Sequence, residues 1–385
     1  MLVIFLWLIF CALSFGVLGL NFVLTRRAAA KPWKLNFDRG FTPSVSFLVP
    51  TYNESDVIRY KLENLHRLDY PKNLIQILIV DSNSTDCTID IVREFVRQHP
   101  ELNVEVLLEC ERGGKSAALN SALSYVKGDL VIVSDADCFY PNDVLQKALP
   151  YLSDPQVGAI SGPKILLNSH ASKVARNEAQ YLKSVNLAKL GESKTGFTPL
   201  FEGGFSAYKR SLLSSFDPYK TGSDDCGTVI KLAEDSYRAL LVPEAAFFTT
   251  FPISWKERFG IKIRRGNQLI RVFGKYLQLL LAGRIKSSKR VILTNTFIYL
   301  FCPVFFVFFL GLTLATFAIY PYLLLLLLLL VTPRVGSILL EAAQSFLILF
   351  FSILAVSSKK NFLIWKKPAD RHLITEDMLR RYNLI

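Results

Sequence analysis

The sequence has few histidines and no regular spacing of cysteines. It contains four histidines, none of them clustered, among 385 residues. The cysteines are scattered along the chain, at Cys11, Cys87, Cys110, Cys138, Cys226 and Cys302. A zinc site or a disulfide framework needs ligands or pairs at characteristic spacings, so we expect neither. Reduced thiols are consistent with a cytosolic domain.

Charge is absent from the first part of the chain. Met1 to Leu24 contains no charged residue and, at about 24 residues, is long enough to cross a hydrocarbon core. It lacks the basic start and the cleavage site of a secretory signal peptide, so residues 1–24 are predicted to form a transmembrane helix. A basic linker, 25–43, follows. The positive-inside rule then places the next domain on the cytoplasmic side of the cell membrane.

Long apolar runs return later in the chain. Hydrophobic residues make up 51% of the sequence and the mean hydropathy is +0.31. Residues 291–331 are almost entirely apolar, with a break at Tyr320-Pro321, and 338–356 is a further apolar run. Two to three transmembrane helices are therefore predicted within 291–357. Three crossings would put the basic tail, 358–385, outside the cell, whereas its many Lys and Arg residues favour the inside, so the sequence leaves the number open.

Acidic residues are scarce just before these apolar runs. Between Trp255 and Arg290 the only acidic residue is Glu257, while many Lys and Arg residues alternate with apolar ones. Much of the net charge of +13 therefore lies close to the membrane spans. This pattern predicts basic amphipathic helices in 251–290 that bind anionic membrane lipids. A nucleic-acid partner is not expected.

Residues 44–250 have the pattern of a soluble α/β domain. Helix-like stretches separate short apolar runs, which are Val45–Val49, Ile75–Val80, Val104–Leu108, Leu130–Val133 and Val157–Ile160. This alternation predicts a doubly wound, mostly parallel sheet. Ligands of such sheets bind outside the carboxyl ends of the strands, where "PTYNE", "DSNSTD" and "DAD" are found.

Two carboxylates follow the fourth apolar run. Asp135 and Asp137 are two residues apart, so they would point to one side of an extended chain, where their charges repel. A hard divalent cation such as Mg²⁺ or Mn²⁺ would relieve that repulsion. The alternative is a helix start that is capped by Asp137 or Asn142.

A second polar stretch, "ERGGKSAALN", places two glycines and a lysine before a predicted helix. Gly113 and Gly114 allow the backbone to approach a ligand, and Lys115 offers a charge for phosphate near a helix N-terminus. The spacing is not that of a Walker A motif. A simple turn is the alternative.

Together, "VPTYNE", "VDSNSTDCT", "GGKSAALN", "SDADCFYPND" and "EGGFSAYKR" resemble, in order and spacing, the motifs of family 2 glycosyltransferases with the GT-A fold. The resemblance covers about 45–250, and the flanking membrane segments are similar to those of the hyaluronan/cellulose synthase-like and polyprenol-linked members. It implies that the nucleotide base and ribose are held by Thr51, Tyr52, Glu54 and Asp81. It also implies that Lys115 lies near the nucleotide, that Asp137 binds Mg²⁺ or Mn²⁺ on the diphosphate, and that Asp135 faces ribose or metal.

The resemblance implies a catalytic base as well. Glu234-Asp235 looks like the family's Glu-Asp pair, but Tyr237-Arg238 follows it too closely. The spacing therefore assigns the pair to Asp224-Asp225, with Asp225 as the base and a helix N-cap as the alternative role. Glu234 and Asp235 are then expected to be solvated near the end of the helix. On the acceptor side the resemblance implies Gly203, Gly204 and Phe205, for which a turn before a helix is the alternative.

One family motif is incomplete. Processive members carry Gln-x-x-Arg-Trp, and "GIKIRRGNQLIRVF" lacks the tryptophan in both possible registers. Arg264 or Arg265 could still bind the diphosphate, and lipid phosphates are the alternative or additional ligand. The missing tryptophan argues against polymer synthesis.

The function predicted on this basis is that of a membrane-bound inverting glycosyltransferase. It would transfer a sugar from a UDP- or GDP-linked donor to a lipid-linked or glycan acceptor at the cytoplasmic face. The alternatives are a processive polysaccharide synthase with export and a non-catalytic scaffold subunit that binds nucleotide sugars. A scaffold would be expected to have lost Asp135, Asp137 or Asp225, and all three are present.

Overall fold

The computed structural model describes residues 1–327, 332–358 and 372–385. These residues divide into two compact units. The helical unit contains the described parts of Met1–Leu24, Phe259–Arg284 and Lys289–Phe362. The sheet unit contains those of Thr25–Arg258, Ile285–Ser288 and Leu363–Ile385.

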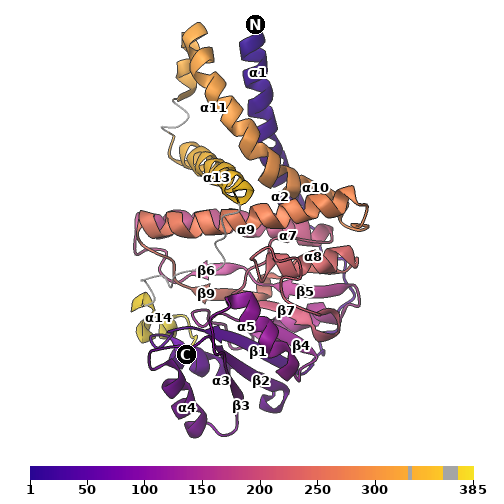
Figure 1. Ribbon diagram of the computed structural model, residues 1–385, viewed down its shortest axis with the longest axis vertical. Coiled ribbons are helices and arrows are strands. Elements are labelled where there is room, and N and C mark those ends of the chain that lie inside the picture. The colour runs from indigo at the N-terminus through magenta and orange to yellow at the C-terminus, as the bar shows by residue number, and fades with distance from the viewer. Residues whose placement is uncertain (328–331, 359–371) are drawn as a thin grey trace. The chain divides into compact units, whose positions relative to one another are not determined.

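A seven-stranded sheet forms the centre of the sheet unit (Figure 1). Its strands are β1 (Val45–Thr51), β2 (Ile75–Asp81), β3 (Asn103–Leu108), β4 (Leu130–Val133), β5 (Val157–Ser161), β7 (Ser206–Lys209) and β8 (Arg238–Leu241), in the order β3-β2-β1-β4-β7-β5-β8. All neighbours are parallel except β7, which is antiparallel to β4 and β5. The predicted mostly parallel α/β sheet is therefore confirmed. A small second sheet pairs β6 (Lys164–Leu166) with β9 (Phe247–Thr249).

The central strands are buried on both faces. Every residue of β2 and of β4 is buried, as expected for parallel strands that helices cover on either side. The helices of this unit are α3 (Ile58–His66), α4 (Thr88–Gln98), α5 (Lys115–Ala122), α6 (Val144–Ala148), α7 (Lys173–Thr195), α8 (Cys226–Glu234) and α14 (Glu376–Arg381). Because helices cover both faces of the sheet, a site is expected in the short polar loops at the carboxyl ends of the strands.

The helical unit is built from apolar helices. α1 (Leu2–Cys11) and α2 (Val17–Ala29) form one long helix through a π-helical turn, and α10 (Lys289–Thr296) joins α11 (Cys302–Ile319) in the same way. α9 (Trp255–Leu281) and α13 (Pro333–Ser357) complete the set. Among the described residues, three helical stretches are long and apolar enough to cross a membrane: Leu2–Ala29, Lys289–Ile319 and Ile338–Ser357. In the sequence, one candidate span thus precedes the α/β domain and two follow it.

The first span and the second run in opposite directions. Trp7 Nε1 donates to Thr313 Oγ1 over 3.0 Å, and the Cys302 thiol lies 3.2 Å from the carbonyl oxygen of Leu13. The amino group of Met1 lies 3.2 Å from the Tyr320 hydroxyl. Early residues of the first helix therefore pair with late residues of the second. α11 ends at Ile319, next to the Tyr320-Pro321 break that the sequence predicted.

Candidate active site

The loops after β1 and β2 are joined by a buried hydrogen bond. Thr51 and Asp81 end these parallel strands in register, and Thr51 Oγ1 donates to Asp81 Oδ1 over 3.0 Å. Asp81 also accepts hydrogen bonds from the backbone and hydroxyl of Ser84. Both Thr51 and Asp81 are almost completely buried. They therefore fix the shape of the edge on which a nucleotide would lie.

Tyr52 has an aromatic face covered by a cation. The guanidinium carbon of Arg112 lies 3.9 Å from the centre of the Tyr52 ring. Glu54, two residues after Tyr52, is buried, and its backbone nitrogen donates to Thr88 Oγ1. Arg112 was not among the residues predicted for the site. Its position directly before Gly113-Gly114 was the one signal that could have indicated it.

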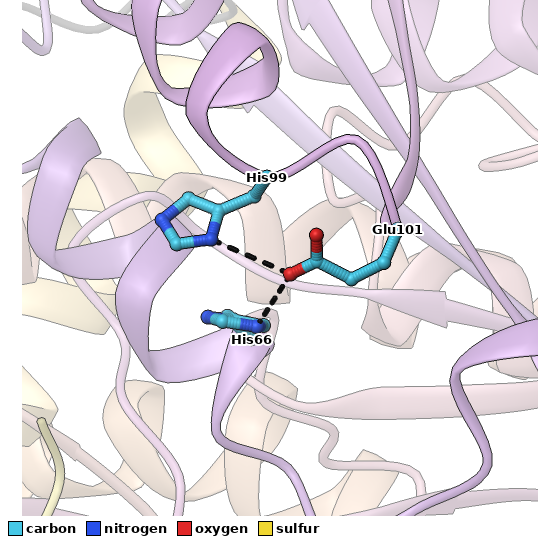
Figure 2. Close-up of side chains that lie close together, drawn as sticks. All are labelled: His66, His99 and Glu101. Carbon is cyan, nitrogen blue, oxygen red and sulfur yellow. Dashed lines mark ion pairs between the residues drawn. The ribbon is translucent and has the colours of Figure 1, made fainter.

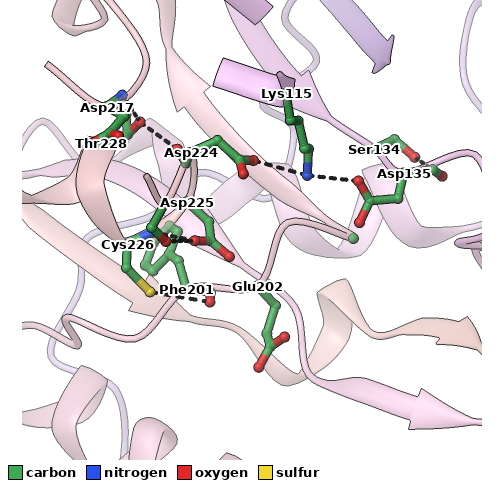
Figure 3. A network of polar contacts seen from close by, with 12 residues as sticks. Lys115, Ser134, Asp135, Phe201, Glu202, Asp217, Asp224, Asp225, Cys226 and Thr228 are labelled. Atoms are coloured by element: carbon green, nitrogen blue, oxygen red, sulfur yellow. Dashed lines mark hydrogen bonds and ion pairs between the residues drawn. The ribbon is translucent and has the colours of Figure 1, made fainter. Parts of the chain in front are cut away.

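Lys115 links two acidic loops (Figure 3). It is the first residue of α5, and Gly114 before it has a φ of 91°, a conformation that favours glycine. Lys115 Nζ lies 2.7 Å from Asp135 Oδ1 and 2.9 Å from Asp224 Oδ2. Burial opposes charge on Lys115, but the two carboxylates outweigh it and raise its pKa well above the usual value. The lysine is therefore a fixed positive charge.

Asp224 has an unusual protonation equilibrium. Burial raises its pKa, Lys115 opposes the increase, and Asp225 and Asp135 add to it, so that the pKa is about 6. Only 16% of the Asp224 side chain is exposed. The charge of this carboxylate thus depends on Lys115.

Asp135 and Asp137 fit a hard divalent cation. Their carboxylate oxygens and the Cys138 sulfur lie within 4.8 Å of one another, and Asp137 Oδ2 accepts a hydrogen bond from Thr249 Oγ1 at 3.3 Å. Burial and the two carboxylates raise the pKa of the Cys138 thiol, so the thiol stays protonated and the two carboxylates are the suitable ligands. The alternative of a helix cap does not hold for Asp137 or Asn142, because α6 begins after Asp143.

Asp225 stands at the start of α8 and Glu234 at its end. The Asp225 carboxylate accepts from the backbone nitrogen of Cys226 and from the Ser223 hydroxyl, so it is also the N-cap of the helix. α8 has 9 residues, or about 13 Å at ~1.5 Å per residue. Asp224 and Asp225 are therefore at the Lys115 end, and the second acidic pair is not.

The expectation that both later acids are solvated was wrong for Glu234. Its side chain is only 9% exposed and contacts the Tyr219 hydroxyl and Lys231. Asp235 is more exposed and pairs with Lys231 at 2.7 Å. The tyrosine comes from an earlier loop, which the local helix pattern does not reveal.

Gly203 and Gly204 are in contact with buried groups. A Cβ on Gly203 would lie 2.6 Å from Lys115 Nζ, and one on Gly204 would lie 2.2 Å from the Phe247 ring. Phe205 is completely buried and packs edge-to-face on Tyr140. Its ring has no exposed surface, so of this stretch only the two glycines remain as candidate acceptor contacts.

Two buried acids near these loops were missed by the sequence analysis. Glu202 pairs with Lys189 at 2.7 Å, directly before Gly203. Asp217 accepts from the backbone nitrogens of Thr221 and Gly222 at 2.9 and 2.6 Å, and burial raises its pKa. Lys189 lies on α7, 13 residues before Glu202, whereas the partners of Asp217 follow it within one loop.

The last predicted residues lie on α9. Arg264 and Arg265 belong to the helical unit. Their role toward a diphosphate or toward lipid remains a prediction.

Two of the four histidines meet away from these loops (Figure 2). His66 Nε2 and His99 Nδ1 lie 3.0 and 3.4 Å from the same oxygen of Glu101. No local sequence pattern indicated this cluster, because the packing of α3 near α4 brings the residues together. Burial, His99 and Lys72 lower the pKa of His66, and Glu101 opposes them. The positive charge of Lys72 disfavours a metal cation here, and the contacts join the end of α3 to the chain that follows α4.

Comparisons with known proteins show what this chain is similar to. A family model described as "Glycosyl transferase family 2" matches residues 46–216. The probable glycosyltransferase YdaM of Bacillus subtilis is 28% identical over 308 residues, which cover 77% of this chain and 70% of that protein. The beta-monoglucosyldiacylglycerol synthase of Synechocystis sp. is 40% identical over 126 residues, 33% of this chain and 26% of that protein.

A solved structure matches nearly the whole chain. It is the mannosyltransferase PcManGT from Pyrobaculum calidifontis in complex with GDP-Man and Mn²⁺. The TM-score is 0.79 at 29% identity, and the match covers 92% of this chain and 99% of that one. The shared fold therefore extends beyond the α/β domain.

Proposed function

Since residues 46–216 form a glycosyl transferase family 2 domain with the GT-A fold, we propose that this chain is a membrane-bound, inverting glycosyltransferase. It moves a sugar from a UDP- or GDP-linked donor to a lipid-linked or glycan acceptor. The observation that carries the proposal is the ion-pair bridge from Asp135 through Lys115 to Asp224. The bridge joins the candidate cation ligands to the loop that carries the candidate base.

The acidic and basic side chains suit the diphosphate of the donor. Asp135 and Asp137 hold Mg²⁺ or Mn²⁺, and the complex of PcManGT with GDP-Man and Mn²⁺ supports a divalent ion. When bound, the ion acts as a Lewis acid that offsets charge on the leaving nucleoside diphosphate. Lys115 adds a fixed positive charge beside it. The ribose and base lie along Thr51 and Asp81, with Tyr52 and Glu54 beside them.

Asp225 is the proposed general base. It accepts the proton of the acceptor hydroxyl, whose oxygen attacks the anomeric carbon from the face opposite the diphosphate. The bond from that carbon to the diphosphate oxygen breaks, and the configuration at the anomeric carbon inverts. Gly203 and Gly204 are the proposed acceptor-side contacts, with Gly203 packed directly against Lys115.

The acceptor is proposed to be a lipid or lipid-linked glycan. The similarity to a beta-monoglucosyldiacylglycerol synthase and the three candidate spans support this choice. Arg264 and Arg265 on α9 are proposed to bind phosphate, either of the donor or of lipid headgroups. The missing tryptophan of the processive motif favours single transfer over polymer synthesis.

The division into units suggests the membrane topology. Residues 372–385 belong to the same compact unit as the α/β domain, so both lie on one side of a membrane. The number of crossings between them is then even. Lys289–Ile319 and Ile338–Ser357 supply two, and the 13 residues 359–371 are fewer than the ~20 that a helical span needs. We therefore favour two spans after the α/β domain, an arrangement that keeps the basic tail on the same side as that domain.

The side is proposed to be the cytoplasm, because Arg26, Arg27, Lys31 and Lys34 follow the first span. Intact cells treated with a membrane-impermeant maleimide test this. The exposed native cysteines, Cys87 and Cys110, should stay unlabelled until the membrane is permeabilised. In a background without native cysteines, Arg381→Cys should behave like them, and Tyr322→Cys should be labelled in intact cells. Labelling of Arg381→Cys from outside would contradict the two-crossing topology.

The test of activity uses the full chain purified in detergent. UDP- and GDP-sugars are screened with Mn²⁺ or Mg²⁺ for release of nucleoside diphosphate, with and without a membrane lipid extract. Release that needs one sugar, a divalent cation and the extract supports transfer to a lipid acceptor. Release without lipid points to hydrolysis or polymer synthesis, which product length separates. Absence of both release and nucleotide binding would favour a scaffold.

A further inference from the structure

The segment 374–385 is part of the hydrophobic core of the sheet unit, although it follows the last candidate span. Ile374, Leu379, Leu384 and Ile385 are buried in the same cluster as residues of β1 and α3. Thr375 caps α14 by accepting a hydrogen bond from the backbone nitrogen of Met378. Figure 1 shows α14 at the side of the sheet, near α3 and α4. Burial of this extent is not typical of an unstructured basic tail.

One buried amide connects this segment to the loop that carries Asp137. Asn64 on α3 is completely buried. Its Nδ2 donates to the carbonyl oxygens of Leu384 and Tyr140, over 2.7 and 2.8 Å, and its Oδ1 accepts from the backbone nitrogen of Tyr140 at 2.9 Å. The Asn64 side chain therefore forms hydrogen bonds with both the backbone N–H and the carbonyl oxygen of Tyr140, and with the carbonyl oxygen of Leu384.

Tyr140 is a central contact of the candidate site. It lies three residues after Asp137, and its hydroxyl donates to the carbonyl oxygen of Gly204 over 2.6 Å. Lys61 lies over its ring and donates to the carbonyl oxygen of Cys138. A shift of Tyr140 would therefore move the backbone next to Asp137 as well as the glycine turn.

A second contact leads from the segment to the same loop. The ring of Tyr382 packs on that of Phe248, with the centroids 5.6 Å apart. Phe248 and Phe139 exchange backbone hydrogen bonds of 2.8 Å in both directions. Two consecutive residues of the loop, Phe139 and Tyr140, are thus held by groups that contact residues 382–384.

On these contacts, and on the function proposed above, we infer that the segment 374–385 positions the Asp135-x-Asp137 carboxylates for cation binding. The segment acts through Asn64 and Phe248. A buried side-chain amide is held rigidly when all its hydrogen bonds are made. If one partner is lost, a buried polar group is left without a hydrogen bond, and the side chain shifts to form another. The divalent-cation affinity of the site therefore depends on chain that follows the membrane spans.

The test compares Leu384→Ala with Arg381→Ala in the full chain. Leu384→Ala removes the apolar side chain that anchors the carbonyl acceptor of Asn64, whereas Arg381 is exposed on the same segment. The Mn²⁺ concentration for half-maximal binding of GDP, and in parallel of UDP, is measured for both. Hydrogen exchange of the backbone amides of residues 138–140 and the melting temperature are measured on the same samples.

Supporting contacts around metal ligands typically change metal affinity by about 10–100-fold. We therefore expect Leu384→Ala to raise the half-saturating Mn²⁺ concentration by about tenfold and to speed exchange at 138–140, with Arg381→Ala unchanged. The double variant Asn64→Ala/Leu384→Ala should need no more Mn²⁺ than Asn64→Ala alone, because both act on the same contact. If Leu384→Ala does not fold, Tyr382→Ala replaces it as the test variant, because the Tyr382 ring is half-exposed. It should also raise the half-saturating Mn²⁺ concentration.

A lower melting temperature with an unchanged Mn²⁺ requirement would overturn the inference, because the segment would then only stabilise the fold. Absence of Mn²⁺-dependent nucleotide binding in the wild type would instead contradict the proposed function. In that case the exchange rates decide the inference by themselves: unchanged rates at 138–140 in Leu384→Ala overturn it, and faster rates support it.

Discussion

The ammonium nitrogen of Lys115 lies 2.9 Å from a carboxylate oxygen of Asp224. The two residues begin different parts of the fold, since Lys115 opens α5 and Asp224 precedes α8. Asp135 approaches the same nitrogen from the opposite direction. Lys115 thus links the candidate cation ligands to the loop before α8.

Asp137→Ala tests the cation site. Loss of a carboxylate ligand is expected to weaken Mn²⁺-dependent binding of the donor by about 100-fold or more, since even supporting contacts are worth about 10–100-fold. The control is Asp143→Ala, which removes a nearby carboxylate that forms a surface ion pair with Lys147. Titration calorimetry with the donor sugar and Mn²⁺ measures both. Equal affinities in the two variants would remove Asp137 from the cation site.

Asp225→Asn tests the base. Asparagine is as good an N-cap as aspartate, so α8 should remain intact and donor binding should be unchanged. Transfer is expected to slow by about 10²–10⁴-fold, which is the usual contribution of a general base. Single-turnover measurements with saturating donor separate the two effects. The matched control is Asp235→Asn at the other end of α8, which should transfer at the wild-type rate, and the opposite ranking would show that the wrong acidic pair was assigned.

The pKa of Asp224 predicts a pH dependence. Since its pKa in the folded chain is raised from 3.8 to about 6, the carboxylate becomes charged as pH rises through 6. The ion pair with Lys115 should form in that range, and kcat/KM for the donor should increase from pH 5 to a plateau above about pH 7. Asp224→Asn should lack this inflection. Persistence of the same midpoint in the variant would assign it to another group.

The same shift has a consequence for stability. The folded chain favours protonated Asp224, so the stability that this group contributes is fully present below about pH 4 and is lost as pH rises through 6. The melting temperature of the wild type relative to Asp224→Asn should therefore fall between pH 4 and 7. A difference that stays constant over that range would argue against the raised pKa.

Gly203→Ala and Gly204→Ala should have different effects. At Gly203 the added Cβ meets the end of the flexible Lys115 side chain, so the lysine moves and donor affinity falls while the fold is retained. At Gly204 it meets the rigid, buried Phe247 ring, which should cost about 1–3 kcal/mol of the free energy of unfolding. Thermal melts and donor binding distinguish the two. Similar melting temperatures for both variants would contradict the close contact with Phe247.

The sequence by itself determined the local features of this protein. The alternation of apolar runs with helical stretches predicted β1 to β5, because a strand's hydrophobic residues must be covered on both faces whatever its neighbours are. The length of the uncharged runs predicted one span before the α/β domain and two to three after it, since a helix needs about 20 apolar residues to cross a hydrocarbon core. The carboxylates after β4 and the glycines before α5 could also be recognised from the local sequence, because these residue types are typical of strand ends and turns.

Only the tertiary structure decided which of these features meet. The order of the strands places Lys115 between Asp135 and Asp224, selects the acidic pair at the start of α8, and buries Phe205 away from any sugar. It also brings Arg112 to Tyr52, His66 to His99, and Leu384 to Asn64. A local pattern records whether a side chain is buried, but its partner is set by packing between segments far apart in the chain, and the sequence carries no periodic signal for that.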